Sequence, residues 1–116
     1  MKIAVTSTGQ KLDDPVGTRP DKCSHWLVVD TVSMEYDAMP NPLVKLGGPA
    51  AGRFLAMLLQ ECMVKFILAG GCGCEQLEGL GKNGMRVLLG VKGSVREAVE
   101  KFSQNYFQDD AEAVRE

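Results

Sequence analysis

Short apolar runs in the first half of the chain predict three β-strands. Residues 2–6 and 25–31 are mostly apolar and predict two buried strands, whereas apolar and polar side chains alternate over residues 33–39 and predict a third. Because the link between the second and third runs is short, we expect these two strands to pair antiparallel as a hairpin. Residues 9–24 and 40–48 are rich in Gly, Pro and polar side chains and predict two loops.

The second half of the chain predicts strands that alternate with helices. Pro49 suits the first turn of a helix, because that position needs no backbone N–H. The apolar residues around and after it recur at steps of three and four and predict a core-facing stripe of Ala51, Phe54, Leu55, Leu58, Leu59 and Cys62. Apolar runs over residues 64–69 and 85–89 predict two parallel strands, separated by a short helix over residues 75–80.

A last amphipathic helix is predicted from a capping box, in which Ser94 precedes Glu97 by three positions. Its apolar face would comprise Val95, Ala98, Val99 and Phe102. The acidic stretch over residues 109–116 is expected to be a frayed tail. The resulting order β-β-β-α-β-α-β-α predicts one α/β domain over residues 1–108, with a mixed sheet flanked by helices.

The composition narrows the class of protein further. Apolar residues make up 45% of the chain and charged residues 24%, which is the balance of an ordinary globular domain. The formal net charge of −2 excludes a broadly basic domain of the kind that binds nucleic acid. The chain has no run of about 18 apolar residues that could span a membrane, and the apolar stretch over residues 3–5 is too short for a secretory signal. We therefore expect a cytoplasmic protein without nucleic-acid or membrane partners.

Two of the four cysteines lie close together in a Gly-rich segment. Only Gly73 separates Cys72 from Cys74, a spacing at which an unstrained disulfide is not expected. In a cytoplasmic protein such clustered thiols indicate metal or redox chemistry. The segment runs from a predicted strand into a predicted helix, where free backbone amides lower a thiol pKa and favour the metal-binding thiolate. The spacing differs from the Cys-x-x-Cys of most zinc sites, so a metal-free redox role for the two thiols stays open.

The predicted topology brings further ligands to the same edge of the sheet. If the second strand runs antiparallel to the first, Cys23 and His25 lie at the edge where the first strand ends. Together with Cys72 and Cys74 they would form a set of three thiols and one imidazole, which suits zinc, copper or an iron–sulfur cluster. For Cys23 and His25 a structural role is the alternative. Cys62, on the apolar stripe of its helix, is expected to belong to the core.

The loops that leave the parallel strands would complete the site. Thr8 in the first loop and Gly71 and Gly73 in the second are expected to contact the bound group, beside Cys72 and Cys74. Basic side chains in neighbouring loops would balance the charge of an anionic cluster; they are Lys11, Arg19, Lys22 and Lys92.

Three segments together resemble the dinitrogenase iron–molybdenum cofactor biosynthesis family, which includes NifX, NafY and the C-terminal domain of NifB. They cover residues 1–14, 26–30 and 87–98. The resemblance implies a ribonuclease H-like three-layer fold with a mixed five-stranded sheet. It also implies that the protein is not an enzyme, but binds or carries a metal–sulfur cofactor or its precursor, of the iron–sulfur or molybdenum-containing type. An acceptor or cluster-assembly protein would then be its partner.

The chain departs from the usual pattern of that family at two places. Residues 19–25 stand where relatives commonly have an Arg-Phe-Gly-Arg-like stretch, and residues 71–74 stand where relatives tend to have Gly, Pro and Asn. Both departures add potential ligands, which favours direct thiolate ligation of a cluster or of a single soft metal ion. Two other functions stay open: a metal-free thiol redox protein that uses Cys72 and Cys74, and an interaction module whose glycine loops bind a partner protein.

Overall fold

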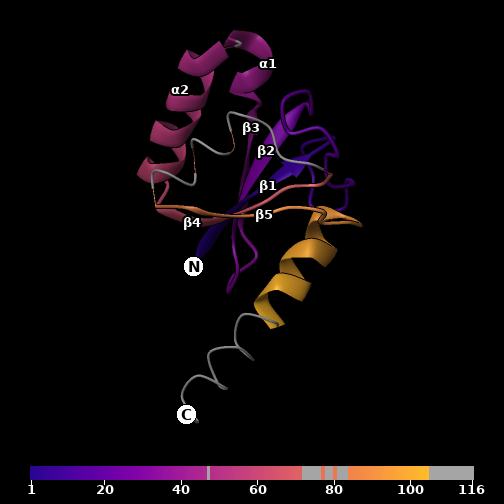
Figure 1. The fold of residues 1–116 in the computed structure, drawn as a ribbon. Helices are drawn as coiled ribbons and strands as arrows, with labels where there is room; N and C mark the ends of the chain where they lie inside the picture. Colours follow the sequence, from indigo (N-terminus) through magenta and orange to yellow (C-terminus); the bar gives the residue numbers. More distant parts are fainter. Residues whose placement is uncertain (47, 72–76, 78–79, 81–83, 105–116) are drawn as a thin grey trace.

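The computed structural model contains one mixed sheet of five strands in the order β3-β2-β1-β4-β5 (Figure 1). It describes residues 1–46, 48–71, 77, 80 and 84–104. The strands are β1 (Lys2–Ser7), β2 (His25–Asp30), β3 (Tyr36–Pro40), β4 (Val64–Leu68) and β5 (Arg86–Leu88). The helices are α1 (Pro42–Leu46) and α2 (Gly48–Glu61), and residues 95–104 form a further helix. The predicted α/β class and mixed five-stranded sheet are confirmed.

The strand directions agree with the predictions. β2 pairs antiparallel with β1 and with β3, so the second and third apolar runs form the expected hairpin. β1 pairs parallel with β4, and β4 pairs parallel with β5. The three parallel strands therefore end at one edge of the sheet, and β2 begins there, with His25 opposite Ser7.

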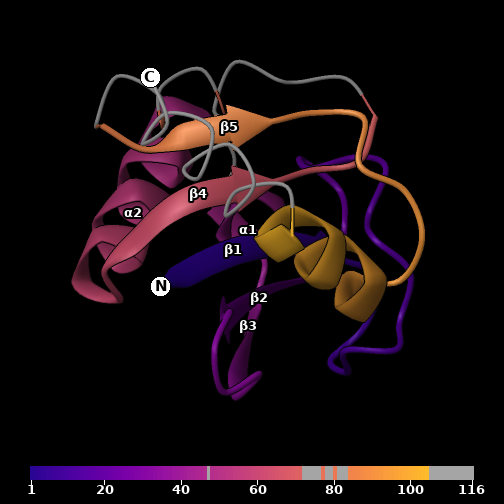
Figure 2. The same cartoon turned by 90° about the horizontal axis from the view of Figure 1, so that it is seen from below.

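Apolar side chains on the two faces of the sheet form two separate clusters. The first cluster joins the sheet to α1 and α2 and includes Trp26, Leu55 and Leu59, all fully buried. The second joins the sheet to the helix over residues 95–104 and includes Val95. Each fully buried side chain of this size contributes about 1.5–3 kcal/mol relative to exposure. Figure 2 shows the sheet between α2 and the last helix, the three-layer arrangement that the sequence resemblance implies.

The capping box of the last helix forms as predicted. The backbone N–H of Glu97 donates to Ser94 Oγ at 3.1 Å, and the N–H of Ser94 donates to Glu97 Oε1 at 3.4 Å. Val95 and Val99 are fully buried, and Phe102 is partly buried against the second cluster. The predicted apolar face of this helix is therefore its core-facing side.

The prediction of a loop over residues 40–48 is wrong, because α1 lies within it. Asn41 caps this helix, since its Oδ1 accepts the N–H of Leu43 at 3.0 Å and its backbone carbonyl accepts the N–H of Val44 at 3.2 Å. Asn at the cap followed by Pro at the first helical position is a helix start signal. The high Gly and Pro content of residues 40–48 led to the prediction of a loop instead of a helix.

The core-facing stripe of α2 also differs from the predicted one. Phe54 is 41% exposed and does not belong to it, whereas Ala51, Leu55 and Leu59 are fully buried. Residues four positions apart lie nearly above one another on a helix, and Phe54 is rotated off that line. Cys62 is partly buried and packs against the first cluster, as expected for a core thiol.

The third strand begins later than predicted. Residues 31–33 form a turn, and β3 begins only at Tyr36. The carboxylate of Asp30 accepts the N–H groups of Val32 at 2.8 Å and Ser33 at 3.3 Å, which gives the backbone an alternative to strand pairing.

Two further predictions concern residues at the edge of what the structure describes. Most of the helix predicted over residues 75–80 lies outside the described residues, although Leu77 and Leu80 are helical and buried. The tail over residues 109–116 also lies outside them. Among the described helices none has the length and apolar character needed to cross a membrane.

Candidate functional site

Loops at the edge where β1, β4 and β5 end form the candidate site. We call them the rim, and they comprise residues 8–24, 69–71 and 89–94. Backbone hydrogen bonds join them: the N–H of Gly70 donates to Gly17 O at 3.1 Å, and the N–H of Gly90 donates to Gly71 O at 3.1 Å. The predicted topology therefore does bring these loops to one edge of the sheet.

Gly70 and Gly71, which precede Cys72, have their backbone in close contact with Gly17 and Thr18 of the loop after β1. A Cβ at Gly70 would lie 2.6 Å from Gly17 O, and a Cβ at Gly71 would collide with Thr18 O. Gly71 also has a φ of +69°, in the left-handed region that glycine adopts without strain. Only glycine fits at these two positions, so the two loops approach more closely than side chains would allow.

Gly17 makes a second close approach, to Cys23. A Cβ at Gly17 would lie 2.6 Å from the Cβ of Cys23. The backbone of Gly17 is thus enclosed by Gly70 on one side and by Cys23 on the other. This arrangement positions the start of the predicted thiol loop and the Cys23 turn against the same residue.

Thr6, in β1 next to the rim, is a residue that was not predicted to belong to the site. Its side chain is fully buried at the end of β1, where Oγ1 donates to Gly17 O at 2.9 Å and accepts the N–H of Gly70 at 3.4 Å. One hydroxyl therefore links the loop after β1 to the loop after β4. The available signal was a polar side chain in an otherwise apolar strand, next to a loop.

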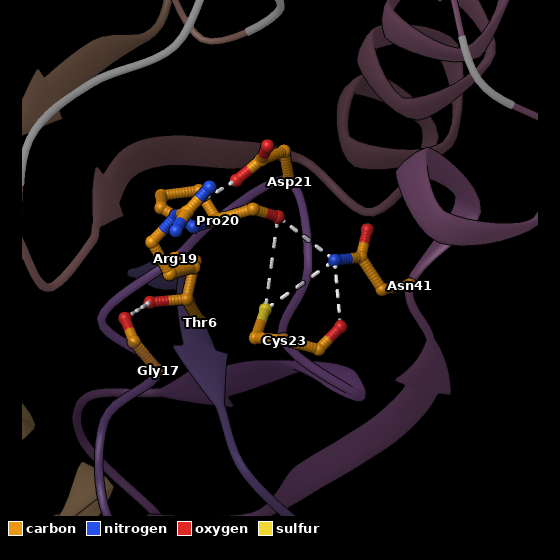
Figure 3. Close-up of polar contacts among 7 residues, drawn as sticks. All are labelled: Thr6, Gly17, Arg19, Pro20, Asp21, Cys23 and Asn41. Carbon is orange, nitrogen blue, oxygen red and sulfur yellow. Dashed lines mark hydrogen bonds and ion pairs between the residues drawn. The ribbon is translucent and has the colours of Figure 1, made fainter.

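Cys23 lies at the rim, but its thiol is enclosed (Figure 3). The residue is 7% exposed, Asn41 Nδ2 lies 3.3 Å from Sγ, and the thiol contacts the carbonyl oxygens of His25 at 3.5 Å and Pro20 at 3.8 Å. Burial raises the pKa of the Cys23 thiol, and hydrogen bonds from the Ser7 backbone and the Asn41 amide offset only part of that shift. In this conformation Cys23 is a neutral thiol.

His25 and Thr8 have nearby polar partners of their own. His25 is half-buried, and its Nδ1 shares a hydrogen bond of 2.8 Å with Ser24 Oγ. Thr8 is exposed, and its hydroxyl donates to Pro15 O at 3.1 Å. Thr8 lies in the rim and His25 at the start of β2, which borders it, so both lie at the edge of the sheet where they were predicted.

Basic side chains border the same loops. Arg19, Lys22 and Lys92 are exposed, and Arg19 Nε lies 3.7 Å from Asp21 Oδ1. Exposed cations of this kind raise the local potential even though the chain as a whole carries a charge of −2. Asp13, Asp14 and Asp21 lie in the same loop and offset part of that positive charge.

The predicted metal ligands are only partly described. Cys72, Gly73 and Cys74 lie outside the described residues, so their roles stay predictions. Within the described ranges no group of three or more His, Cys, Asp or Glu side chains is close enough to hold a metal ion. Cys23 lies two residues before His25, which begins β2, and the two do not form such a group with other described residues.

Three comparisons relate this chain to known proteins. The model of a family described as dinitrogenase iron-molybdenum cofactor matches residues 1–105. The apo form of the orange protein from Desulfovibrio gigas is 28% identical with a TM-score of 0.76, over 90% of this chain and 88% of that chain. A putative NifB protein from Thermotoga is 25% identical with a TM-score of 0.70, over 89% of this chain and 87% of that chain. No curated protein matches the chain.

Proposed function

We infer the function from one premise, which is that the chain belongs to the dinitrogenase iron–molybdenum cofactor family. Membership confirms the resemblance recognised in the three sequence segments. We propose that this protein binds a metal–sulfur cofactor or its precursor at the rim and carries it to an acceptor or cluster-assembly protein. The bound group is cargo, and the protein is a carrier, not a catalyst.

The close packing of Gly70 and Gly71 on Gly17 and Thr18 carries this proposal. It supports a rim site because the next residue along the chain is Cys72. The ends of parallel strands are also the usual ligand site of open α/β sheets. A structural neighbour of 28% identity, the orange protein, was solved in what is described as its apo form.

We assign Cys72 and Cys74 as the principal ligands, with Gly71, Gly73 and Thr8 lining the site. Thiolates prefer soft metals, so iron, copper or molybdenum with sulfide suits them better than magnesium or calcium. Arg19, Lys22 and Lys92 would compensate the negative charge that thiolates and sulfide bring.

Cys23 and His25 are proposed as additional ligands that join after a local change. The Cys23 thiol must leave the carbonyl groups of Pro20 and His25 and lose its proton before it can bind a metal. The raised pKa of Cys23 adds to the cost of that change. We therefore expect Cys23 to contribute less to cargo binding than the two thiols of the Gly-rich segment.

The test is anaerobic reconstitution with iron and sulfide, or with molybdate, copper and sulfide. We expect visible absorbance and protein-bound metal by elemental analysis, and Cys72→Ser/Cys74→Ser should lose most of both. Cys62→Ser is the matched control, because Cys62 lies between α2 and β4 at the opposite edge of the sheet. An unchanged metal content in the double variant would overturn the assignment.

The same protein distinguishes the metal-free redox function. If the metal-free chain reversibly loses two thiols on mild oxidation and takes up no metal, Cys72 and Cys74 form a redox pair. In that case the carrier function is wrong. If the protein shows neither metal binding nor thiol oxidation, the remaining candidate function is an interaction module whose glycine loops bind a partner protein.

A further inference from the structure

Asn41 is a buried polar side chain at the junction of β3 and α1, and the proposed function does not use it. It is 2% exposed, and its amide group contacts three separate parts of the chain. Buried amides that are fully hydrogen-bonded fix the relative position of the groups they join. Figure 3 shows its nitrogen directed toward the turn that carries Cys23.

The oxygen of this amide is anchored to rigid elements. Oδ1 accepts the indole N–H of Trp26 at 2.9 Å and the backbone N–H of Leu43 at 3.0 Å. Trp26 is fully buried in β2, and Leu43 lies in the first turn of α1. The position of Asn41 is therefore determined by the core and not by the rim.

The nitrogen of the amide holds both ends of the turn. Nδ2 donates to Pro20 O and to Cys23 O, each at 2.8 Å, and lies 3.3 Å from Cys23 Sγ. Because the group has two hydrogens, the two carbonyl oxygens take them and the sulfur is a weaker, shared contact. Inside the turn, the N–H groups of Lys22 and Cys23 donate to Arg19 O at 2.8 and 2.7 Å.

The turn held in this way carries three charged side chains, Arg19, Asp21 and Lys22, with Arg19 Nε 3.7 Å from Asp21 Oδ1. Arg19 and Lys22 are its exposed cations, and Cys23 packs against Gly17, on which Gly70 lies. A shift of the turn would move both cations relative to the start of the thiol segment. Asn41 lies outside the rim, but its hydrogen bonds fix the position of the turn over residues 19–23, which is part of the rim.

We propose that Asn41 is a positioning residue for cargo binding: its amide N–H groups fix the turn over residues 19–23, so that Arg19 and Lys22 are held in place for an anionic metal–sulfide cargo. This inference rests on the proposed function and deepens it. It assigns the recognition of cargo charge to the turn over residues 19–23.

The first experiment separates the two sides of the amide. Asn41→Asp keeps an oxygen acceptor for Trp26 and Leu43 but loses the donors to the turn, whereas Trp26→Phe removes an acceptor-side bond and leaves the donors in place. Alkylation by iodoacetamide is followed for each cysteine by peptide mass spectrometry, at a pH high enough to ionise exposed thiols, so that access to Cys23 and not its pKa sets the rate. We expect Cys23 to react about tenfold faster in Asn41→Asp, as loss of hydrogen bonds worth about 1.4 kcal/mol predicts, and not in Trp26→Phe.

A second variant keeps the experiment decisive if a buried carboxylate prevents folding. Asn41→Ser is neutral, and Ser is a favourable N-cap for α1, but its hydroxyl cannot reach both carbonyl groups of the turn. Faster alkylation of Cys23 is expected here as well, with Cys62 unchanged as the internal control. Equal acceleration in Trp26→Phe and in the Asn41 variants would mean that Asn41 acts only through overall stability, and the positioning role would be wrong.

The second experiment measures binding of tetrathiomolybdate, an anionic metal–sulfide probe. We expect the Kd to rise about tenfold in Asn41→Ser and to change little in Trp26→Phe. The double substitution Arg19→Gln/Lys22→Gln should raise the Kd when it is made in the otherwise wild-type chain. In the Asn41→Ser chain it should raise the Kd little further, because the cations are already displaced.

The outcomes distinguish this inference from the function on which it rests. If Asn41→Ser exposes Cys23 but leaves the Kd unchanged, the positioning role is overturned and the carrier function stands. If the wild-type chain binds no probe and takes up no metal on reconstitution, the carrier function fails and the inference fails with it. Additive effects of the Asn41 and cation variants would likewise overturn the positioning role.

Discussion

The two ends of β2 are closed by turns that are stabilised in different ways. At the Asp30 end the stabilising group is local: the Asp30 carboxylate accepts the N–H groups of Val32 and Ser33 from the turn that it begins. At the His25 end the turn over residues 19–23 depends on Asn41, a side chain from another part of the fold. The turn over residues 31–33 (the local turn) is held mainly by the residue that begins it, with Thr31 also bonded to Met1 O. The turn over residues 19–23 (the rim turn) has its own bonds to Arg19 O, but its position relative to the core depends on Asn41.

The largest effect is expected where the rim turn loses its remote anchor. Asn41→Ala leaves the buried N–H of Trp26 and the carbonyl groups of Pro20 and Cys23 without this partner, so we expect a loss of about 3 kcal/mol in the free energy of unfolding. Urea denaturation followed by Trp26 fluorescence measures it. Asp30→Ala is the matched variant at the other end of β2 and should lower the urea midpoint by less. The comparison between the two turns fails if Asp30→Ala is the more damaging change.

A smaller effect is expected from crowding the rim turn without removing its anchor. In Gly17→Ala the new Cβ would lie 2.6 Å from the Cβ of Cys23, which has to shift, and a loss of about 2 kcal/mol is expected. Thr18→Ala, at the exposed neighbouring position, should change the unfolding free energy by no more than about 0.5 kcal/mol. The same urea experiment measures both. Equal effects of the two substitutions would show that Cys23 shifts to accept the added methyl group at no cost in stability.

The smallest effect is expected at the local turn, and it depends on pH. Hydrogen bonds from Val32 and Ser33 hold the pKa of Asp30 below its ordinary value. Because the folded-state pKa is lowered, the stabilisation is present above the unfolded-state pKa of about 3.9 and is lost as the pH falls through the folded-state pKa. Asp30→Asn keeps an oxygen acceptor but cannot ionise. We expect its urea midpoint to be slightly below that of the wild type at pH 7, and the gap to close on acidification. A gap that widens at low pH would contradict the assignment.

The strands could be predicted from the sequence because each is a short apolar run with a clear boundary. Topology then followed from the short hairpin link and the alternation of the second half, and it brought Cys23 and His25 to the correct edge of the sheet. The start of α1 at Asn41 was missed, although the cap and the following proline were both visible. Local sequence patterns therefore predict where helices and strands lie, provided that capping residues are considered together with the Gly and Pro content.

The environment of Cys23 could not be predicted in the same way. Its burial depends on Asn41, which lies 18 residues further along the chain, and on a close approach by Gly17 that no periodicity reveals. Thr6 poses the same difficulty, because a single hydroxyl in an apolar strand gives no indication of which loops it will join. Contacts of this kind depend on the assembled tertiary structure, and the candidate site consists mostly of them.

The contact between Thr6 and Gly70 spans 64 residues of sequence, which has a consequence for the order of folding. Contacts between distant residues pay a larger loop-closure entropy and form later than a hairpin such as β2–β3. During synthesis the first three strands leave the ribosome before β4 and its following loop exist. A growing chain therefore lacks the contact between the loops after β1 and β4 until both have been made. Under the proposed function, cargo binding at the rim would follow the synthesis of β4 and its loop.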